Sequence, residues 1–119
     1  MSEECFSKIF VKGDCTHAAL LSLVAEALPG EIDDWTVVGD DCEVDVRPNE
    51  DHSPEALRRD PTDFVYFPYT VEVASTGAGC TDHVHRVAVL MQAMHERGMQ
   101  VVTASDWESE LPGKGRLGI

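Results

Sequence analysis

Residues 13–17 (GDCTH) and residues 79–83 (GCTDH) are two versions of one short pattern, and together they decide how the chain is expected to fold. Each version follows a strand-like run and precedes apolar sequence with helical periodicity. Further strand-like sequence follows each helical stretch. The chain therefore contains two successive units, each with the order strand, helix, strand.

The first unit begins with residues 5–12, where Ile9 and Val11 alternate with Phe6, Lys8 and Phe10. Alternation with a period of two predicts a strand with two different faces. A helix is predicted to follow, with Asp14 or Thr16 as its N-cap, and to end at residues 29–30 (PG). Residues 35–38 and 42–47 then form either one bulged strand or a small hairpin.

A long connection, residues 48–63, precedes the second unit, and Ser53 with Pro54 predicts one helical turn inside it. Such a connection is either a functional loop or an insertion without function. Residues 64–74 are the most strand-like stretch, with odd-numbered residues from Val65 to Val73 on one face and a bulge or strand start expected at Pro68. Thr81 is the predicted cap of the second helix, and residues 99–104 form the last strand.

With right-handed crossovers, this order predicts an α+β, ferredoxin-like βαββαβ fold, a four-stranded antiparallel sheet with two helices on one face. We expect the first and third strands to run parallel, side by side. Residues 1–112 form the single predicted domain, and residues 113–119 a flexible C-terminal tail.

Charge is the strongest compositional feature of the 119 residues: 9 are basic and 22 acidic, for a net charge of −13. The acids are concentrated between residues 31 and 51. This distribution argues against nucleic-acid binding, which depends on Lys and Arg at phosphates. A basic protein partner fits better, although solubility alone is an alternative reason for the charge.

Location and thiol chemistry are predicted from the same sequence. No apolar run is long enough for a membrane span, and the first residues are acidic, so a cytoplasmic location is expected.

The four cysteines are expected to be free thiols, because they include no CxxC pair, although their even number permits two disulfides. They are Cys5, Cys15, Cys42 and Cys80. No cofactor is predicted.

Two cysteines and two histidines at the helix starts, Cys15, His17, Cys80 and His83, could approach one another if the first and third strands are parallel. Such a set is competent to bind zinc, but its spacings match no known finger. Cys80 near a helix N-terminus could instead be a nucleophile. The alternative is two capped helices with buried thiols and exposed imidazoles, and it is preferred.

The sheet face away from the helices is predicted to display Phe6, Phe10, Phe64 and Tyr66. Exposed aromatic patches usually mark contact surfaces. We expect a homodimer through this face, or a covering segment. The candidates for covering it are residues 48–63 and 107–111.

The whole chain resembles small, acidic, cytoplasmic bacterial proteins with a βαββαβ core, among them immunity-type proteins that neutralise basic toxin domains. The resemblance involves this architecture, residues 31–45 (EIDDWTVVGDDCEVD) and residues 106–112 (DWESELP). It implies a protein-binding function and transfers no individual site residue.

The sequence therefore favours a non-enzymatic, acidic protein-binding module of inhibitor or immunity type. Its predicted partner-binding residues are Asp33, Asp34, Asp40, Asp41, Glu43, Asp45 and Glu72. The alternative is a small-ligand-binding or enzymatic homodimer that uses the open sheet face or the helix starts. Its candidate residues are Phe10, Tyr66, His17, Cys80 and His83.

Overall fold

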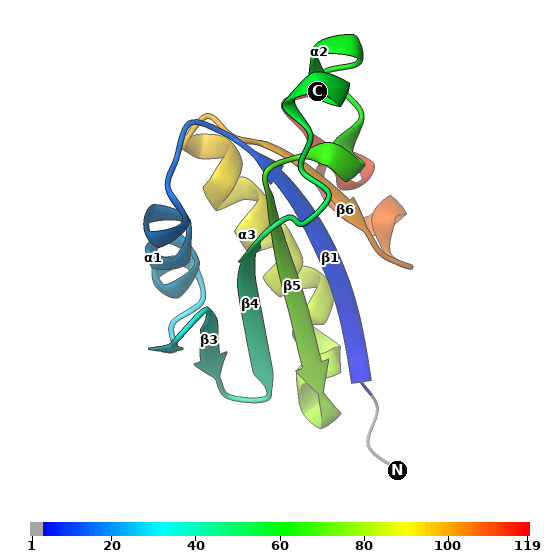
Figure 1. The fold of residues 1–119 in the computed structure, drawn as a ribbon. Helices are drawn as coiled ribbons and strands as arrows, with labels where there is room; N and C mark the ends of the chain where they lie inside the picture. The colour runs from blue at the N-terminus through cyan, green and yellow to red at the C-terminus, as the bar shows by residue number, and fades with distance from the viewer. Residues whose placement is uncertain (1–3) are drawn as a thin grey trace.

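A single seven-stranded antiparallel sheet organises the molecule (Figure 1), in a computed structural model that describes residues 4–119. The strand order is β2-β3-β4-β5-β1-β6-β7. The strands are β1 (Glu4–Lys12), β2 (Glu31–Asp33), β3 (Thr36–Gly39), β4 (Cys42–Pro48), β5 (Tyr69–Thr76), β6 (Gln100–Ala104) and β7 (Arg116–Leu117). The α-helices are α1 (His17–Ala27), α2 (Pro54–Arg59) and α3 (His83–Glu96).

The chain is α+β, but the predicted ferredoxin-like architecture is wrong, because the sheet has seven strands rather than four and the described chain has three α-helices rather than two. Strand β2 adds an edge beyond β3, to which it is joined by a turn in which Asp34 adopts a positive φ of 59°. All three residues of β2 are exposed and show no alternating pattern, so the sequence did not predict this strand. At the other edge, β7 pairs with β6.

The predicted parallel pairing of the first and third strands is also wrong, because β1 and β5 are antiparallel. The two strands β1 and β4 flank β5, and each pairs with it in antiparallel register. The end of β1 and the end of β5 therefore lie at opposite ends of the sheet. This places the two helix starts far from each other.

Helices α1 and α3 pack on one face of the sheet, and the main core lies between these helices and the strands. On the strands, Ile9 and Val11 point into this core, as predicted, and are fully buried. Burial of such side chains contributes about 1.5–3 kcal/mol each. Other members from the helices and strands are Leu20, Leu21, Val24, Val44, Val46, Val71, Val73, Val87, Leu90, Met91 and Met94.

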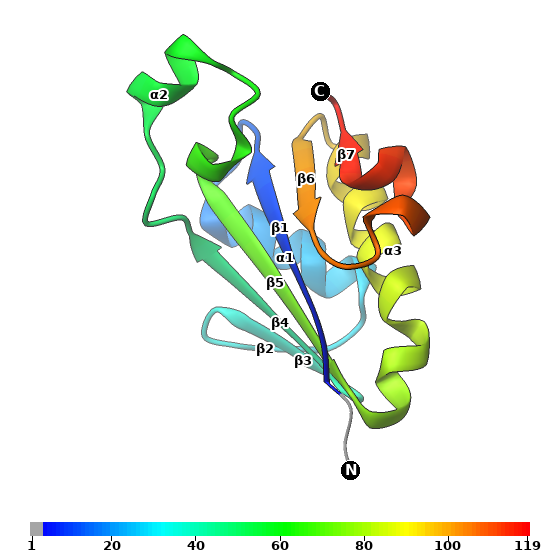
Figure 2. The ribbon, with the colours of Figure 1, turned by 90° about the vertical axis from the view of Figure 1, so that its right-hand side faces the viewer.

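A smaller cluster covers one end of the opposite face. It consists of Phe10, Leu57, Phe67 and Val102, and the Phe64 ring packs edge-on against Phe10 at 5.2 Å between centroids. The 48–63 connection, through Leu57, is thus one covering segment. Residues 107–111 are not, since Leu111 packs into the helix-side core. The α2 segment itself stands beyond the ends of β4 and β5 (Figure 2).

The predicted single face from Val65 to Val73 is wrong in its first half. Residues Phe64–Tyr66 form a 3-10 helix, and β5 begins at Tyr69, so Pro68 precedes the strand start. Phe67 consequently packs on the face opposite to Val71.

The helix caps follow the sequence in most places. Thr16 accepts a hydrogen bond from the Ala19 amide at 3.1 Å, and Ser53 caps α2 in the same way. Thr81 does not cap α3, because a 3-10 helix (Gly77–Asp82) precedes that helix. Residues 113–119, expected to form a flexible tail, contain β7.

Candidate functional site

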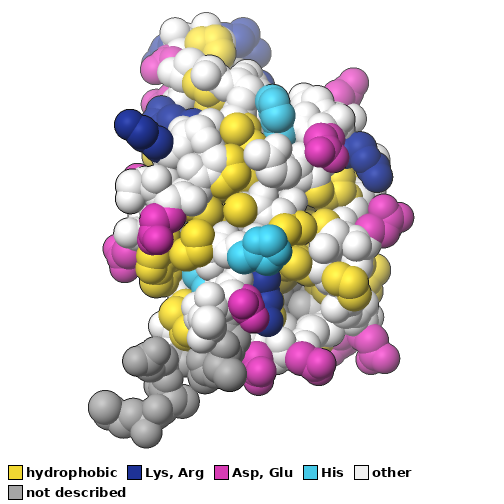
Figure 3. Space-filling view, turned by 180° about the vertical axis from the view of Figure 1, so that it is seen from behind, with side chains coloured by type: hydrophobic (Ala, Val, Ile, Leu, Met, Phe, Trp, Pro, Cys, Tyr) yellow, Lys and Arg dark blue, Asp and Glu magenta, His cyan; other side chains and the backbone are white. Residues whose placement is uncertain are grey.

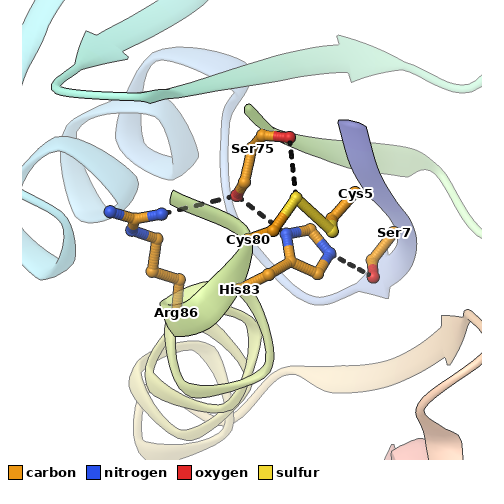
Figure 4. The surroundings of a disulfide bond; sticks show 6 residues. All are labelled: Cys5, Ser7, Ser75, Cys80, His83 and Arg86. Atoms are coloured by element: carbon orange, nitrogen blue, oxygen red, sulfur yellow. Dashed lines mark hydrogen bonds between the residues drawn. A yellow bond between two sulfur atoms is a disulfide. The ribbon is translucent and has the colours of Figure 1, made fainter. Parts of the chain in front are cut away.

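A buried histidine lies at the N-terminal end of α3. His83 is 1% exposed, and both of its ring nitrogens contact serine hydroxyls (Figure 4). Nε2 lies 2.9 Å from Ser7 Oγ on β1, and Nδ1 lies 2.8 Å from Ser75 Oγ on β5. One imidazole therefore ties the start of α3 to two neighbouring strands.

One tautomer of His83 is compatible with the contacts that His83 makes to Ser7 and Ser75 and with the contact that Ser75 makes to Arg86. The Arg86 guanidinium donates to Ser75 Oγ at 3.5 Å, so the Ser75 hydroxyl hydrogen can be donated to Nδ1 of His83. Nε2 then carries the remaining ring proton and donates it to Ser7. A neutral imidazole satisfies all three contacts.

A disulfide between Cys5 and Cys80 lies beside this cluster. The expectation that all four cysteines are free thiols is wrong, and Cys15 and Cys42 are the two free ones. The Cys80 sulfur lies 3.6 Å from the backbone oxygen of Ser75, and the side-chain hydroxyl of the same serine contacts His83. The indole of Trp107 packs edge-on against the imidazole, with 5.1 Å between centroids.

Burial decides what this cluster can do chemically. Burial lowers the pKa of His83, and the positive charge of Arg86 lowers that pKa further. Ser7 and Ser75 are 1% and 0% exposed, so neither hydroxyl can meet a substrate in this conformation. Burial likewise raises the pKa of the Cys42 thiol, which disfavours a thiolate nucleophile. The cluster is therefore a structural network rather than a catalytic site.

The convergence that a parallel pairing of the first and third strands would have allowed for Cys15, His17, Cys80 and His83 does not occur. The antiparallel pairing of β1 and β5 separates the first two from the last two. His17 Nε2 instead donates to the Val46 carbonyl at 2.6 Å. Within residues 4–119, no group of three or more His, Cys, Asp or Glu side chains is arranged to hold a metal ion.

The predicted partner-binding acids divide into two sets. The sheet register places Asp33, Thr36, Asp45, Glu72 and Lys8 in one row across five strands. A second, neighbouring row contains Glu31, Val38, Glu43, Ala74 and Phe6. Both rows lie on the face away from α1 and α3, and we call them the acidic sheet face.

The remaining predicted acids lie in turns rather than in these rows. Asp34 is in the β2–β3 turn, while Asp40 and Asp41 are in the β3–β4 turn at the other end of β3. They can therefore border the acidic sheet face but do not form part of it. Glu31 was not among the predicted residues, although Asp33 on the same strand was.

The acidic sheet face combines charge with exposed apolar side chains. Phe6 is 49% exposed and Val38 is 38% exposed. Asp45 accepts a hydrogen bond from Thr36 and lies 4.0 Å from Arg47. On the helix side, by contrast, acidic side chains lie mostly around the margin (Figure 3).

The residues of the alternative ligand site do not form an open platform. Phe10 is covered by Phe64 and Leu57, while Tyr66 is half-buried beside them. A cavity of about 180 Å³ does open at the border of the covered region, between Lys8, Arg47 and Glu72. Basic and acidic side chains line this cavity, and no aromatic ring does.

Sequence reasoning missed Ser7, Ser75, Trp107 and the disulfide pairing. A signal for the serines was present, since Ser7 shares the parity of Ile9 and Ser75 that of Val73. Polar residues at buried strand positions need a hydrogen-bond partner, and His83 provides it. Trp107 had no comparable signal.

Comparison with known proteins adds no relative: no family model, curated protein or solved structure matches the chain. Among the described residues, no helix combines the length and apolar character that crossing a bilayer demands.

Acidification should weaken the fold through His83. Its folded pKa lies below the ordinary value of 6.5, so between these two values the unfolded chain binds a proton that the folded chain does not. In that window the free energy of unfolding falls as pH falls, by up to about 1.4 kcal/mol per pH unit. Urea denaturation at stepped pH measures this slope.

The matched variants are His83→Gln and His95→Gln, the latter at an exposed position. The difference in unfolding free energy between wild type and His83→Gln should shrink as the pH falls through that window. His95→Gln should keep the slope that His83 contributes. An unchanged slope in His83→Gln would contradict the assignment.

Proposed function

We propose that this chain is a non-enzymatic module that binds a basic protein through the acidic sheet face. The observation that carries the proposal is the alignment of Asp33, Asp45 and Glu72 in one row, with Glu31 and Glu43 in the next. Residues far apart in the sequence thus create one surface on which five acids outnumber Lys8, the basic residue of the two rows. Such a surface accelerates association with a positively charged partner.

The apolar members of the same face support a contact surface rather than a merely solvated one. Phe6 and Val38 stand among the acids with much of their side chains exposed. Protein interfaces combine an apolar centre with polar groups around it. Neutralisation of a basic toxin domain, as in immunity-type proteins, is the form of this function that we propose.

A homodimer through the same face is the second candidate, suggested by the exposed Phe6. Face-to-face pairing of two copies would bring two acidic rows together, and like charges across an interface are costly. This favours a basic partner over a second copy. The cytoplasmic location expected from the sequence remains part of the proposal.

Reversing two charges on the face should weaken partner binding by more than about tenfold at low salt. We choose Asp33→Lys with Glu43→Lys, because both side chains are exposed. The control is Glu96→Lys with Glu110→Lys, which changes the net charge by the same amount. Both control positions are exposed; Glu96 lies at the end of α3, and Glu110 lies in the 3-10 helix Glu108–Glu110.

Wild type and both variants are immobilised, and proteins are captured on them from host lysate at low and at high salt. The captured protein is then purified, and its affinity for each variant is measured. One basic protein retained by wild type and by the control, and lost by the face variant, is expected. Equal retention by both variants would remove the acidic sheet face from the proposal. A chain that dimerises in sizing experiments, with dissociation in a Phe6→Lys variant, would favour the second candidate.

A further inference from the structure

The disulfide and the buried histidine join the same two segments of the chain. Cys5 and Ser7 lie two residues apart on β1, with their side chains on the same face. Cys80 and His83 lie three residues apart, one on the 3-10 helix and one at the start of α3. The covalent bond Cys5–Cys80 and the hydrogen bond Ser7–His83 are therefore neighbouring links between β1 and one helical segment.

We propose that Cys5–Cys80 is a site of reversible thiol–disulfide exchange with dithiols, and that its reduction opens the His83 cluster to water. This inference does not depend on the proposed partner, but it rests on the cytoplasmic location that belongs to the proposed function. It concerns the helix-facing side of the sheet, whereas the acidic sheet face lies on the other side.

Accessibility supports the first half of the proposal. Cys5 and Cys80 are partly exposed, whereas Ser7, Ser75 and His83 are buried. The disulfide-bonded cysteines are thus more accessible to a reductant in solution than the cluster beside them. In reducing compartments, protein disulfides are usually transient and serve catalysis or redox sensing. A partly exposed disulfide in a protein expected in the cytoplasm belongs in that group.

The exchange requires one dithiol and balances without any other reactant. One dithiol thiolate attacks a sulfur of the pair, forming a mixed disulfide and releasing the other cysteine as a thiolate, which takes up a proton. The second dithiol sulfur then attacks the mixed disulfide and releases the remaining cysteine. The protein gains two electrons and two protons, and the dithiol becomes a cyclic disulfide.

The reduced state has a ready hydrogen-bond partner. A Cys80 thiol can donate to the Ser75 carbonyl, which lies 3.6 Å from the sulfur in the present structure. Cys5, on β1, has no further covalent tie to the helical segment. After reduction, the links between this segment and the strands still include the contacts of His83 with Ser7 and Ser75, and that of Arg86 with Ser75.

Increased solvent access changes the titration of His83. Arg86 on α3 is the charged side chain that acts on its pKa. β1, β5 and the segment after β6 contribute Ser7, Ser75 and Trp107, which do not titrate near neutral pH. Loss of burial therefore removes the largest cause that holds the imidazole neutral.

The experiment follows the His83 ring by NMR across pH, with and without dithiothreitol. Protein that has not been treated with reductant should show two reactive thiols when it is titrated under unfolding conditions. Reduced protein should show four under the same conditions. The His83 resonances should titrate at higher pH in the reduced protein. Cys5→Ser with Cys80→Ser should reproduce the reduced behaviour without reductant, and Cys15→Ser should leave wild-type behaviour unchanged.

Trp107 provides a second signal that does not need the double variant to fold. In a Trp35→Phe background, Trp107 is the remaining tryptophan, and its ring contacts His83. Its fluorescence should shift on reduction and return on reoxidation with oxidised dithiothreitol. Identical His83 titration curves in the oxidised and reduced protein, or four reactive thiols before reduction, would overturn the inference.

Discussion

Replacing Phe67 with alanine should lower the free energy of unfolding by about 3–5 kcal/mol, the range for a fully buried phenylalanine. Phe67 is 0% exposed and is the largest fully buried side chain of the cluster that covers one end of the open sheet face. Its removal leaves a cavity against Phe10 and Val102 that neighbouring strands cannot fill without distorting the sheet. Urea denaturation followed by circular dichroism measures the loss.

Phe6→Ala is the matched control, because the same substitution is made at a side chain that is 49% exposed. Its effect on stability should stay within about 0.5 kcal/mol. The difference between the two variants tests whether the face is covered at Phe67 and open at Phe6. Equal losses of stability would contradict this division, on which the acidic sheet face depends.

The covered end is also held by backbone contacts. The Asn49 side chain donates to the carbonyls of Val65 at 2.9 Å and Phe67 at 2.7 Å. These bonds hold both ends of the 48–67 segment together. A change at Phe67 should therefore release the segment as a unit, and hydrogen exchange in residues 49–67 should accelerate in the variant.

The second large effect is expected at His83. His83→Leu removes the partner of two buried hydroxyls, on Ser7 and Ser75. Each unsatisfied group costs about 1–3 kcal/mol, so a total loss of about 2–6 kcal/mol is expected for the two. His85→Leu, the same change at an exposed position two residues along α3, should cost little.

A triple variant separates lost hydrogen bonds from altered packing. Adding Ser7→Ala and Ser75→Ala to His83→Leu removes the hydroxyls that the histidine had satisfied. Replacing both partners by apolar groups is often nearly neutral, so at least half of the lost stability should return. If the three losses instead add, the contacts of His83 with the serines do not determine its contribution to stability.

Much of the local structure was predictable because it depends on neighbouring residues. The alternation in residues 5–12 determined which side of β1 faces the core, and Ile9 and Val11 are buried there. The caps at Thr16 and Ser53 depend on hydrogen bonds over three residues. The alternation along β4 likewise placed Glu43 and Asp45 away from the core.

The acidic sheet face could be predicted only in part for a related reason. Period-two alternation predicts which side chains share a face of one strand, but not which strand lies beside it. Asp45 and Glu72 become neighbours through the β4–β5 register. Glu31 and Asp33 join them only because β2 extends the sheet, and three exposed residues provide too little pattern to predict a strand.

The sequence by itself determined the order of the main strands and helices, the buried side of each strand with clear alternation, and the strong negative charge. Only the tertiary structure decided that β1 and β5 are antiparallel, that Phe67 covers the face opposite to Val71, and that Cys5 meets Cys80. The physical reason is the range of the interactions. Caps and alternation depend on neighbours along the chain, whereas strand pairing and the contact between residues 75 positions apart depend on the packing of the entire sheet.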